Sequence, residues 1–253
     1  MRAGSLLLAA ALVGLAGCSG SPDDERPAPT EILEQVVDPA TAFTMDGTGC
    51  REILVLMSVP AEQARPFVPP QYELVGAVSG SATAFAALKH CDDLAVDGLS
   101  VGPASTGDAG VFVDQGEPGV FQYYQTWWAT DSAALSGRLQ AQGWPVVLAN
   151  DSLTFTPLAQ AAMAAASVES AEHGYEVAAN VAFARAAGDN RAVGWFDGAA
   201  GTVTVDKLLA SVQLGSGTGT LVARGTAAEL YGPNAVGIAL WNEYEMLGNV
   251  GLH

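Results

Sequence analysis

The chain has few positively charged residues. Its 253 residues include 10 lysines and arginines against 27 aspartates and glutamates, which gives a formal net charge of −17 at pH 7. A strongly acidic protein repels the phosphates of nucleic acids, of phosphorylated ligands and of anionic lipid headgroups. We therefore expect no nucleic-acid partner and no electrostatic docking to a membrane surface.

The sequence also lacks the residue spacings that bind metal ions. It has three histidines and contains no His-Glu-x-x-His or Cys-x-x-Cys pattern. Four aspartates between residues 92 and 108 do not have the spacing of an EF-hand loop, which needs a glycine and a terminal glutamate at fixed positions. We predict no metal site and a solvated acidic loop in that region. The four aspartates are Asp92, Asp93, Asp97 and Asp108, and the three histidines are His90, His173 and His253.

Motifs that bind cofactors or activate a serine are missing too. The glycine-rich segment Gly215–Gly219 lacks the Lys-Ser/Thr ending of a phosphate-binding loop and the spacing of a dinucleotide fingerprint. We expect a flexible β-turn between two strands there. No Gly-x-Ser-x-Gly elbow supports a serine hydrolase. The sequence therefore predicts no cofactor.

Long hydrophobic runs are absent as well. The apolar run Leu6–Leu15 is shorter than the roughly 20 residues that a membrane-spanning helix needs. It follows one basic residue, Arg2, and precedes the small residues Ala16 and Gly17, which is the pattern of a secretory signal. Because Cys18 comes directly after them, the segment resembles a bacterial lipobox. The alternatives are an ordinary signal peptide cut nearby and a fortuitous cysteine.

The lipobox interpretation predicts where the protein resides. Residues 1–17 would be a lipoprotein signal peptide that is removed, and Cys18 would carry the lipid. Acyl chains bury at roughly 0.8 kcal/mol per methylene and would anchor the protein. We therefore expect a membrane-anchored lipoprotein of the bacterial cell envelope, on the extracytoplasmic side, whose contact with the membrane is the lipid on Cys18.

Only three cysteines are present. With Cys18 acylated, Cys50 and Cys91 are the one available pair. Outside the cytosol the default for such a pair is a disulfide, which would stabilise the fold by about 3–4 kcal/mol. The alternatives are two buried thiols or a metal site, which would need histidine partners.

The composition indicates a tether followed by one domain. The segment Ser19–Pro29 is rich in serine, proline, glycine and charge, so residues 18–49 are predicted to be a lipidated and flexible N-terminal region, with a short helix near Glu31–Val37. Residues 50–253 read as one continuous domain without a later linker or a repeat at fixed period. Apolar residues make up 49% of the chain, which is enough for a sizeable core.

Strand patterns dominate this domain. Short apolar, β-branched or aromatic stretches alternate with glycine, aspartate, asparagine and proline. The sequence therefore predicts a mainly β fold (β-rich α+β), an antiparallel sheet or barrel with few helices. The expected strands are Glu52–Val59, Ser81–Leu88, Val111–Val113, Val120–Ala129, Val146–Ala149, Leu153–Thr156, Tyr175–Ala184, Ala192–Phe196, Thr202–Val205, Ala210–Leu214, Thr220–Arg224 and Val236–Tyr244.

Helices are expected at two places. Pro60 suits the first turn of a helix over Ala61–Phe67, and the prolines at 69 and 70 end it. Asp131 is expected to cap a second helix over Ser132–Gln142, which Gly143 would end. Residues 158–167 fit either a helix or a strand.

Two stretches together resemble the acetoacetate decarboxylase-like superfamily. The first is Ile53–Leu56 followed by Val59–Pro69, a strand that runs into a short helix ending in Val-Pro. The second is Asp131–Arg138 followed by Gly143–Val147, with an acidic helix start, a Gly-Arg pair and an aromatic-Pro pair before the next strand. The resemblance covers residues 50–247. It implies a cone-shaped antiparallel β-barrel with a few peripheral helices around an apolar cavity.

The sequence departs from this family at the reactive amine. In the decarboxylases two lysines follow the aromatic-Pro pair, and one of them forms a Schiff base with a β-keto acid while its neighbour lowers its pKa. Here these positions match Val146 and Val147, and the whole chain contains only Lys89 and Lys207. The resemblance therefore implies a barrel that has lost decarboxylation by this mechanism.

Aromatic residues are the candidates for a ligand cavity. The predicted strand Val120–Ala129 has large rings on both faces. They form either ordinary core packing or the wall of a cavity, with tyrosine and tryptophan presenting polar tips at its mouth. The cavity candidates are Tyr123, Tyr124, Trp127, Trp128, Val146, Val147, Trp195, Trp241 and Tyr244.

These observations favour non-catalytic binding of a small hydrophobic or amphipathic molecule in the barrel, although a fold does not determine a function. One alternative is a lyase, hydrolase or cyclase acting on a β-dicarbonyl compound, which would need Lys89, His90, Glu117 or Glu243 to converge in the cavity. The other is an envelope scaffold or interaction protein with an exposed apolar patch. If these residues have no catalytic role, we expect Lys89 to be solvated, His90 to be partly buried and His173 to be exposed in a turn.

Overall fold

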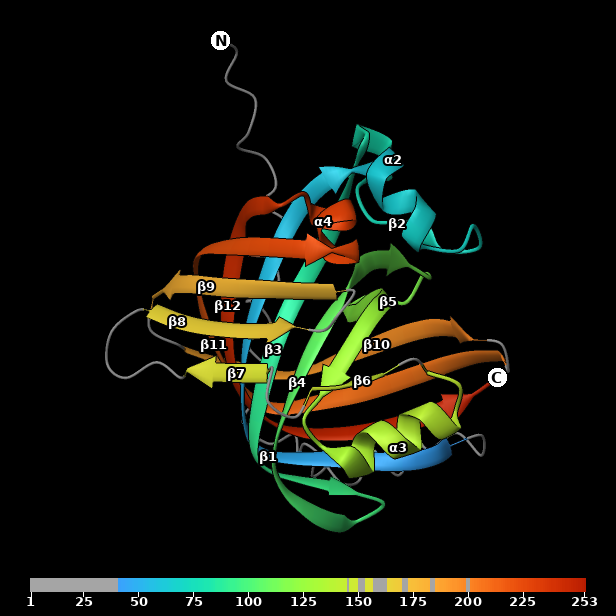
Figure 1. The fold of residues 1–253 in the computed structure, drawn as a ribbon, viewed down its shortest axis with the longest axis vertical. Helices are drawn as coiled ribbons and strands as arrows, with labels where there is room; N and C mark the ends of the chain where they lie inside the picture. The colour runs from blue at the N-terminus through green and yellow to red at the C-terminus, as the bar shows by residue number, and fades with distance from the viewer. Residues whose placement is uncertain are drawn as a thin grey trace, which may run out of the picture. The chain divides into compact units, whose positions relative to one another are not determined.

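The computed structural model describes residues 41–144, 146–149, 153–156, 163–169, 173–182, 185–198 and 201–253. Within these residues the chain is mainly β, as the sequence predicts (Figure 1). The strands are β1 Thr41–Pro60, β2 Glu73–Leu74, β3 Ser81–Val96, β4 Leu99–Asp114, β5 Val120–Thr130, β6 Val147–Leu148, β7 Leu153–Thr156, β8 Met163–Glu169, β9 His173–Val181, β10 Arg185–Gly198, β11 Gly201–Gly225 and β12 Asn234–Leu252. The helical segments are α2 Ala61–Ala64, η1 Arg65–Phe67, η2 Ala77–Ser79, α3 Ala133–Ala141 and α4 Thr226–Tyr231.

Seven of the described strands close into a ring. Hydrogen bonding runs in the order β10-β5-β4-β3-β1-β12-β11, and β11 pairs back with β10. Neighbours in the ring are antiparallel except β5 and β10, which are parallel. We call this ring the barrel. Strand β1 of this ring begins at Thr41. The sequence predicts a later start of the domain, at Cys50.

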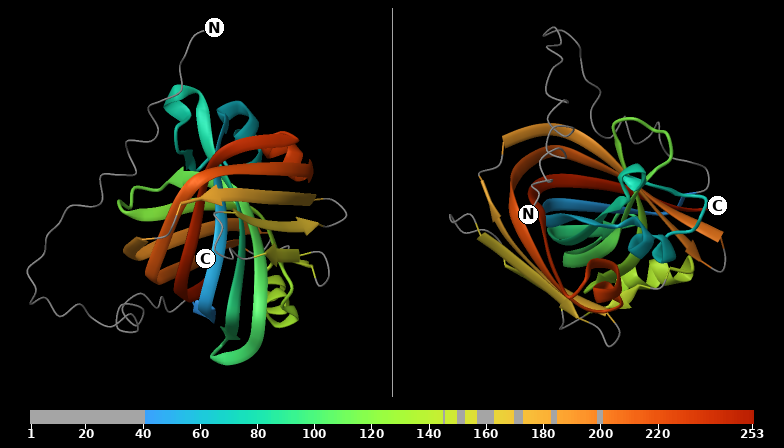
Figure 2. Two further views of the ribbon diagram at one scale, coloured as in Figure 1. Left: turned by 90° about the vertical axis from the view of Figure 1, so that its left-hand side faces the viewer. Right: turned by 90° about the horizontal axis from the view of Figure 1, so that it is seen from above.

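Strand β11 belongs to two parts of the sheet. Up to Leu214 it pairs with β10, and from Gly217 onward it pairs with β9. A bulge between Ala210 and Gln213, with Ser211 at φ 57°, lets the strand bend between the two. Strands β9, β8 and β7 continue the sheet from there and lie across the outer face of β1, β3 and β4 (Figures 1 and 2).

The glycine-rich segment Gly215–Gly219 is not the turn that we expected. It lies inside β11, and the chain continues as a strand through it. A Cβ atom on Gly217 would lie 1.8 Å from the carbonyl oxygen of Asn180, and one on Gly219 would lie 2.8 Å from Val55. These glycines therefore allow the close approach of neighbouring chain segments rather than a reversal of direction.

The expected acidic loop over residues 92–108 is also wrong. Asp92 and Asp93 are part of β3, and Asp108 is buried in β4. The chain reverses in the two-residue turn Asp97-Gly98, where both residues have positive φ, 52° and 73°. This conformation is typical of the tight hairpin turn for which the dipeptide Asp-Gly is favoured.

The helices agree with the prediction in place but differ in detail. The helix expected over residues 61–67 is α2 followed by η1. Ser132, not Asp131, caps α3, because its hydroxyl accepts a hydrogen bond from the amide of Leu135 at 3.3 Å. Asp131 instead accepts one from the amide of Ser105 at 2.7 Å, which joins the start of α3 to β4. The ambiguous segment 158–167 is β-strand from Met163, and the rest of it lies outside the described residues.

Hydrophobic side chains pack on both sides of the barrel wall. One cluster lies between the outer face of the ring, strands β7 to β9 and α4, and includes Ile53, Val55 and Tyr175. Two further clusters lie inside the ring, one around Met45 and Met246 and a smaller one around Phe85 and Tyr123. No helix among the described residues is long and apolar enough to cross a bilayer.

Candidate functional site

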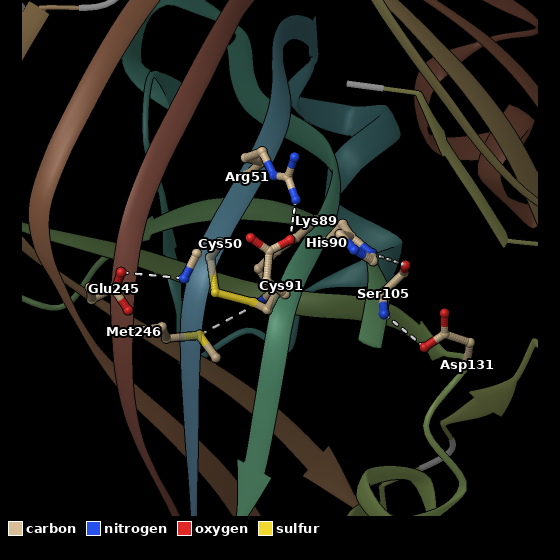
Figure 3. Close-up of a disulfide and its surroundings, with 11 residues drawn as sticks. Cys50, Arg51, Lys89, His90, Cys91, Ser105, Asp131, Glu245 and Met246 are labelled. Atoms are coloured by element: carbon tan, nitrogen blue, oxygen red, sulfur yellow. Dashed lines mark hydrogen bonds and ion pairs between the residues drawn. A yellow bond between two sulfur atoms is a disulfide. The ribbon is translucent and has the colours of Figure 1, made fainter. Parts of the chain in front are cut away.

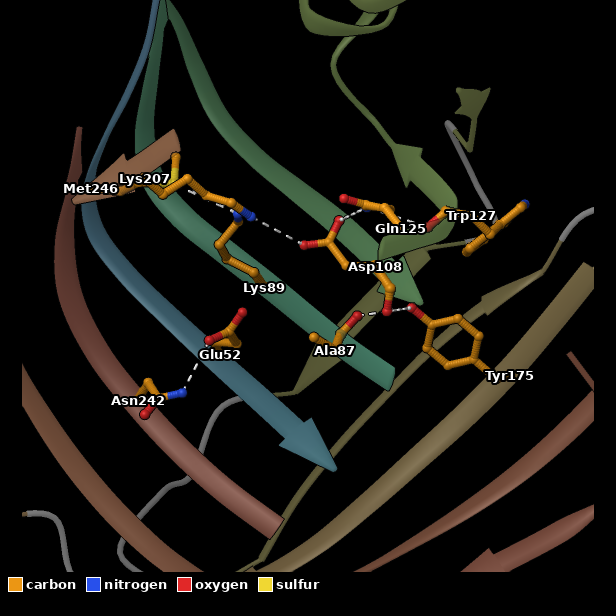
Figure 4. Close-up of polar contacts among 10 residues, drawn as sticks. All are labelled: Glu52, Ala87, Lys89, Asp108, Gln125, Trp127, Tyr175, Lys207, Asn242 and Met246. Carbon is orange, nitrogen blue, oxygen red and sulfur yellow. Dashed lines mark hydrogen bonds and ion pairs between the residues drawn. The ribbon is translucent and has the colours of Figure 1, made fainter. Parts of the chain in front are cut away.

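Strand register brings charged residues together inside the barrel. Glu52 of β1 lies directly opposite Lys89 of β3, on the same face as Leu54 and Ala87. Asp108 of β4 and Lys207 of β11 point into the same interior from across the ring (Figure 4). We call Glu52, Lys89, Asp108, Gln125 and Lys207 the lysine cluster.

Lys89 is not solvated, contrary to expectation. Its side chain is only 3% exposed, and Nζ lies 3.7 Å from the sulfur of Met246. Burial, followed by the neighbouring charge of Lys207, lowers the pKa of Lys89, and this outweighs the opposing effect of Asp108 and Glu52. A larger fraction of this amine is therefore neutral and nucleophilic than in a lysine exposed to water.

Lys207 is the member of the pair that forms an ion pair. It is 7% exposed, and its Nζ lies 3.8 Å from Oδ2 of Asp108. The ammonium group also lies over the rings of Tyr123 and Trp128, at 5.4 and 5.7 Å from their centroids. A carboxylate and two aromatic faces compensate this ammonium for the loss of water.

Glu52 completes the cluster on the side of β12. Burial raises the pKa of its carboxyl group, although both lysines act in the opposite direction. Asn242 donates a hydrogen bond to it at 3.0 Å, and the Tyr244 hydroxyl is a neighbour whose pKa the Glu52 carboxyl helps to raise. A carboxyl group with a raised pKa beside an amine with a lowered pKa can pass a proton during a reaction.

Two buried polar atoms of the site have no hydrogen-bond partner among the described residues, Oε1 of Gln125 and the hydroxyl of Tyr123. The amide nitrogen of Gln125 donates to Asp108 at 3.1 Å and to the carbonyl of Trp127 at 3.3 Å. Leaving a buried polar group unpaired costs about 1–3 kcal/mol. These atoms, in the same interior as the buried amines, are positions that a water or a small ligand can pair with.

The predicted disulfide is present. Cys50 and Cys91 are bonded across β1 and β3, two residues from Glu52 and Lys89 in their respective strands (Figure 3). Beside it lies a pocket of about 470 Å³ whose lining includes Cys50, Arg51 and Tyr244. Tyr244 therefore borders this pocket and also neighbours Glu52 of the lysine cluster.

Several solved structures that are similar to this chain share one fold. An acetoacetate decarboxylase-like enzyme from Sphingomonas wittichii RW1 has a TM-score of 0.60 at 12% identity, covering 86% of this chain and 93% of that one. The acetoacetate decarboxylase of Legionella pneumophila has a TM-score of 0.56 at 11% identity, covering 94% and 98%. The enduracididine biosynthesis enzyme MppR, complexed with pyruvate, has a TM-score of 0.55 at 16% identity, covering 85% and 91%. The fold is acetoacetate decarboxylase-like.

Sequence comparison adds nothing to this result. No protein-family model matches the chain. No curated protein sequence matches it either. At these identities the likeness to the solved structures shows the fold alone, so the chemistry of this acetoacetate decarboxylase-like barrel depends on its own residues.

The aromatic cavity candidates do not line one space. Tyr123, Trp128 and Tyr244 belong to or border the interior clusters, whereas Tyr124, Trp127, Trp195 and Trp241 pack in or against the outer cluster. A bulge in β5 explains the division. Gly110 pairs with Gln125 while Ala109 pairs with Trp127, so Thr126 is an extra residue that reverses the side on which later residues point.

The two valines pack in different hydrophobic clusters. Val146 is buried in the interior cluster that includes Trp128 and Trp144, and Val147 packs against the outer cluster and pairs with Ala129. Their match to the lysine positions of the decarboxylases stays a prediction. Neither residue supplies an amine, and the amine of this barrel is on β3.

The other candidate catalytic residues do not converge with Lys89. His90 follows it in β3 and so faces the opposite side, where its Nδ1 lies 2.9 Å from the Ser105 hydroxyl and its ring stacks on Phe155. Glu117 forms an exposed ion pair with Arg191. Glu243 accepts a hydrogen bond from the indole of Trp241.

His173 is not the exposed turn residue that we expected. It begins β9, is buried, and stacks on Trp127 with 4.2 Å between ring centroids. Its Nδ1 lies 2.6 Å from the hydroxyl of Thr226. Burial lowers its pKa to about 4, so the ring is neutral at pH 7. Within the described residues, no group of three or more histidine, cysteine, aspartate or glutamate side chains is placed to hold a metal ion.

Proposed function

We propose that the barrel binds a small carbonyl compound and captures it as an imine on Lys89. One observation carries this proposal: the chain has only two lysines, and both are buried in the barrel interior, where Lys89 has a lowered pKa. Burying two amines in one interior is costly, and a reactive site is the physical role that such a pair fits.

The chemistry follows from the protonation states. The neutral Nζ of Lys89 attacks the carbonyl carbon, and a C–N bond forms. The carbonyl oxygen takes up two protons in turn, one as the carbinolamine forms and one as the oxygen leaves as water, and the Glu52 carboxyl is the nearest acid in register. The attacking nitrogen gives up its two protons, which return through Glu52. One water is released for each imine formed, and no oxidant or reductant is consumed.

This proposal joins two hypotheses from the sequence. Binding of a small ligand in the barrel is retained, and the imine adds the covalent chemistry on a carbonyl compound that the enzyme hypothesis requires. The non-catalytic hypothesis rests on the absence of an amine at Val146 and Val147. Lys89 supplies an amine from a different strand, which favours covalent capture.

The route to the amine is proposed to pass Tyr244. This residue lines the pocket of about 470 Å³ and neighbours Glu52. Rotation of the Tyr244 side chain would connect the pocket to the lysine cluster without any change in the barrel strands. The acidic residues Asp92, Glu243 and Glu245 around the pocket would disfavour the entry of anions.

We further propose that the protein is a lipoprotein of the bacterial cell envelope, anchored through lipid on Cys18 and exposed on the extracytoplasmic side. The signal-like residues 1–17 and Cys18 support this, and so does the Cys50–Cys91 disulfide, which is typical of oxidising compartments. Residues 1–40 lie outside the described part of the chain.

Reductive trapping tests the proposed imine. The detergent-solubilised full chain is incubated with acetaldehyde and sodium cyanoborohydride at pH 7, with N-acetyl-lysine amide as an internal reference, and alkylation is mapped by peptide mass spectrometry. We expect Lys89 to react at least tenfold faster than the reference, and Lys207 to react more slowly than Lys89.

The substitution Lys89→Met is the matched variant, because methionine fills similar space beside Met246 without an amine. It should abolish the fast reaction while thermal unfolding shows that the fold is kept. If Lys89 in the unchanged protein reacts no faster than the reference amine, the proposed function is wrong.

A further inference from the structure

The charges of the barrel interior constrain the ligand that would fit it, given the imine proposed above. Lys207 is already paired with Asp108, and Lys89 and Glu52 are both shifted toward their neutral forms. Lys207 is therefore already occupied by Asp108, and the lowered pKa of Lys89 makes its amine a weaker counter-ion than an exposed lysine. A carboxylate ligand would lose its water and gain only this weak counter-ion, which is unfavourable.

Gln125 then specifies a hydrogen-bond donor on the ligand. Its side chain is fully buried, and its amide nitrogen bonds to a carboxylate and a carbonyl, which can only accept. The orientation of the amide is thereby determined, and Oε1 can act only as an acceptor. No described residue donates to it.

Tyr123 specifies the complementary group. Burial raises the pKa of its hydroxyl well above the ordinary value, so it stays protonated and can donate. It too has no partner among the described residues. A ligand hydroxyl both donates and accepts, so it matches the acceptor of Gln125 and the donor of Tyr123 alike.

The position of this hydroxyl follows from Asp108. One carboxylate contacts the Gln125 amide through Oδ1 and the Lys207 ammonium through Oδ2, at 3.1 and 3.8 Å, and Lys89 interacts with the same group (Figure 4). The acceptor of Gln125 is therefore close to the amines. We propose that the ligand is a neutral aldehyde or ketone with a hydroxyl group on the carbon next to the carbonyl.

A series of three-carbon ketones tests this proposal. Acetone is neutral without a hydroxyl, hydroxyacetone is neutral with one, and pyruvate is an anion. Each ketone is added at increasing concentration to the full chain in the presence of cyanoborohydride. The rate of trapping at Lys89 is divided by the rate on the reference amine, which corrects for the different intrinsic reactivities of the ketones. We expect half-saturation at an about tenfold lower concentration for hydroxyacetone than for acetone, and pyruvate to be the weakest.

Two variants separate recognition from reactivity. Gln125→Leu and Tyr123→Phe each remove one of the two unpaired groups, and each should bring the hydroxyacetone-to-acetone ratio close to one. Gln63→Leu, the same kind of change on a half-buried glutamine outside the barrel, should leave the ratio as it is. Tyr123→Phe keeps the test available if Gln125→Leu does not fold.

The outcomes distinguish this inference from the function on which it rests. If no ketone and no aldehyde is trapped at Lys89, the imine itself is wrong. If trapping occurs but acetone equals hydroxyacetone, pyruvate is preferred, or the variants leave the ratio unchanged, the carbonyl site stands and the hydroxylated, neutral ligand is overturned. In that case the unpaired atoms hold water only.

Discussion

Lys89 lies beside Lys207 inside the barrel, where burial and then the neighbouring charge hold the pKa of Lys89 below the ordinary lysine value. Asp108 forms an ion pair with Lys207, with 3.8 Å between Oδ2 and Nζ. Among the ion pairs of the described residues, none includes Lys89. The two amines therefore have different roles: Lys207 carries the charge and Lys89 carries the reactivity.

This relationship predicts the effect of removing Lys207. In Lys207→Met the repulsion is lost and Asp108 is free to interact with Lys89, so both changes raise the pKa of Lys89. We expect reductive trapping at pH 7 to slow by roughly tenfold and its pH profile to move to higher pH. Lys207→Arg keeps the positive charge and is the control. An unchanged profile in Lys207→Met would show that burial alone determines the reactivity of Lys89.

The disulfide is predicted to be a major stabilising element. It closes a loop between residues 41 positions apart in the sequence, which corresponds to about 3–4 kcal/mol in the chain-entropy model. We expect the double substitution Cys50→Ala, Cys91→Ala to lower the free energy of unfolding in urea by this amount. Reduction of the unchanged protein should produce a similar loss, and a loss below 1 kcal/mol in both would contradict the prediction.

His173 predicts a dependence of stability on pH. Its pKa falls from 6.5 in the unfolded chain to about 4 in the fold, so the unfolded chain binds the proton first as the pH drops. Stability should be complete above pH 6.5 and decline by about 2–3 kcal/mol between pH 6.5 and pH 4. Because carboxylates also titrate in this range, the test is the difference between the unchanged protein and His173→Gln. Parallel curves for the two proteins would rule out this contribution.

The close packing at β11 predicts a large cost for one added methyl group. A Cβ on Gly217 would overlap the carbonyl oxygen of Asn180 at 1.8 Å, and backbone cannot move aside as a side chain can. We expect Gly217→Ala to destabilise the protein by about 2–3 kcal/mol in urea unfolding. Gly137 on α3 has open space around its Cβ position, so Gly137→Ala should instead stabilise by about 0.5–1 kcal/mol. Equal effects of the two changes would refute the packing argument.

The lipid anchor is predicted to depend on Cys18. Cys18→Ser removes the acylated thiol, so we expect the protein to move from the membrane fraction to the soluble fraction and to lose incorporation of a labelled fatty acid. Cys50→Ser, which changes a cysteine of the domain, is the control and should stay in the membrane fraction. Membrane retention of Cys18→Ser would reject the lipoprotein hypothesis.

Much of the fold could be predicted from local patterns. The expected strand Glu52–Val59 is the second half of β1, and the expected strand Ser81–Leu88 is the first half of β3. Two local signals were misinterpreted. Gly215–Gly219 was expected to form a turn, but its glycines allow close packing inside a strand. Asp97-Gly98 is a turn signal that the sequence contains and that would have joined β3 to β4.

The candidate site was harder to predict. Strict alternation along β5 places Tyr123 and Trp127 on one face, but the extra residue Thr126 puts Trp127 outside and Trp128 inside. Nothing in the local sequence identifies that bulge. The one available signal for Lys89 is its place in an apolar strand with small neighbours, which is unusual for a solvated lysine.

The sequence by itself determined the β class and the acidic net charge, and it made Cys50 and Cys91 the expected disulfide pair, because these follow from alternation, from composition and from the small number of cysteines. Only the tertiary structure decided that Lys89, Asp108 and Lys207 meet. They lie on β3, β4 and β11, and closure of the ring brings these strands around one interior while register and bulges select which side chains enter it. Long-range pairing has no local signature, and the chemistry of this barrel depends on it.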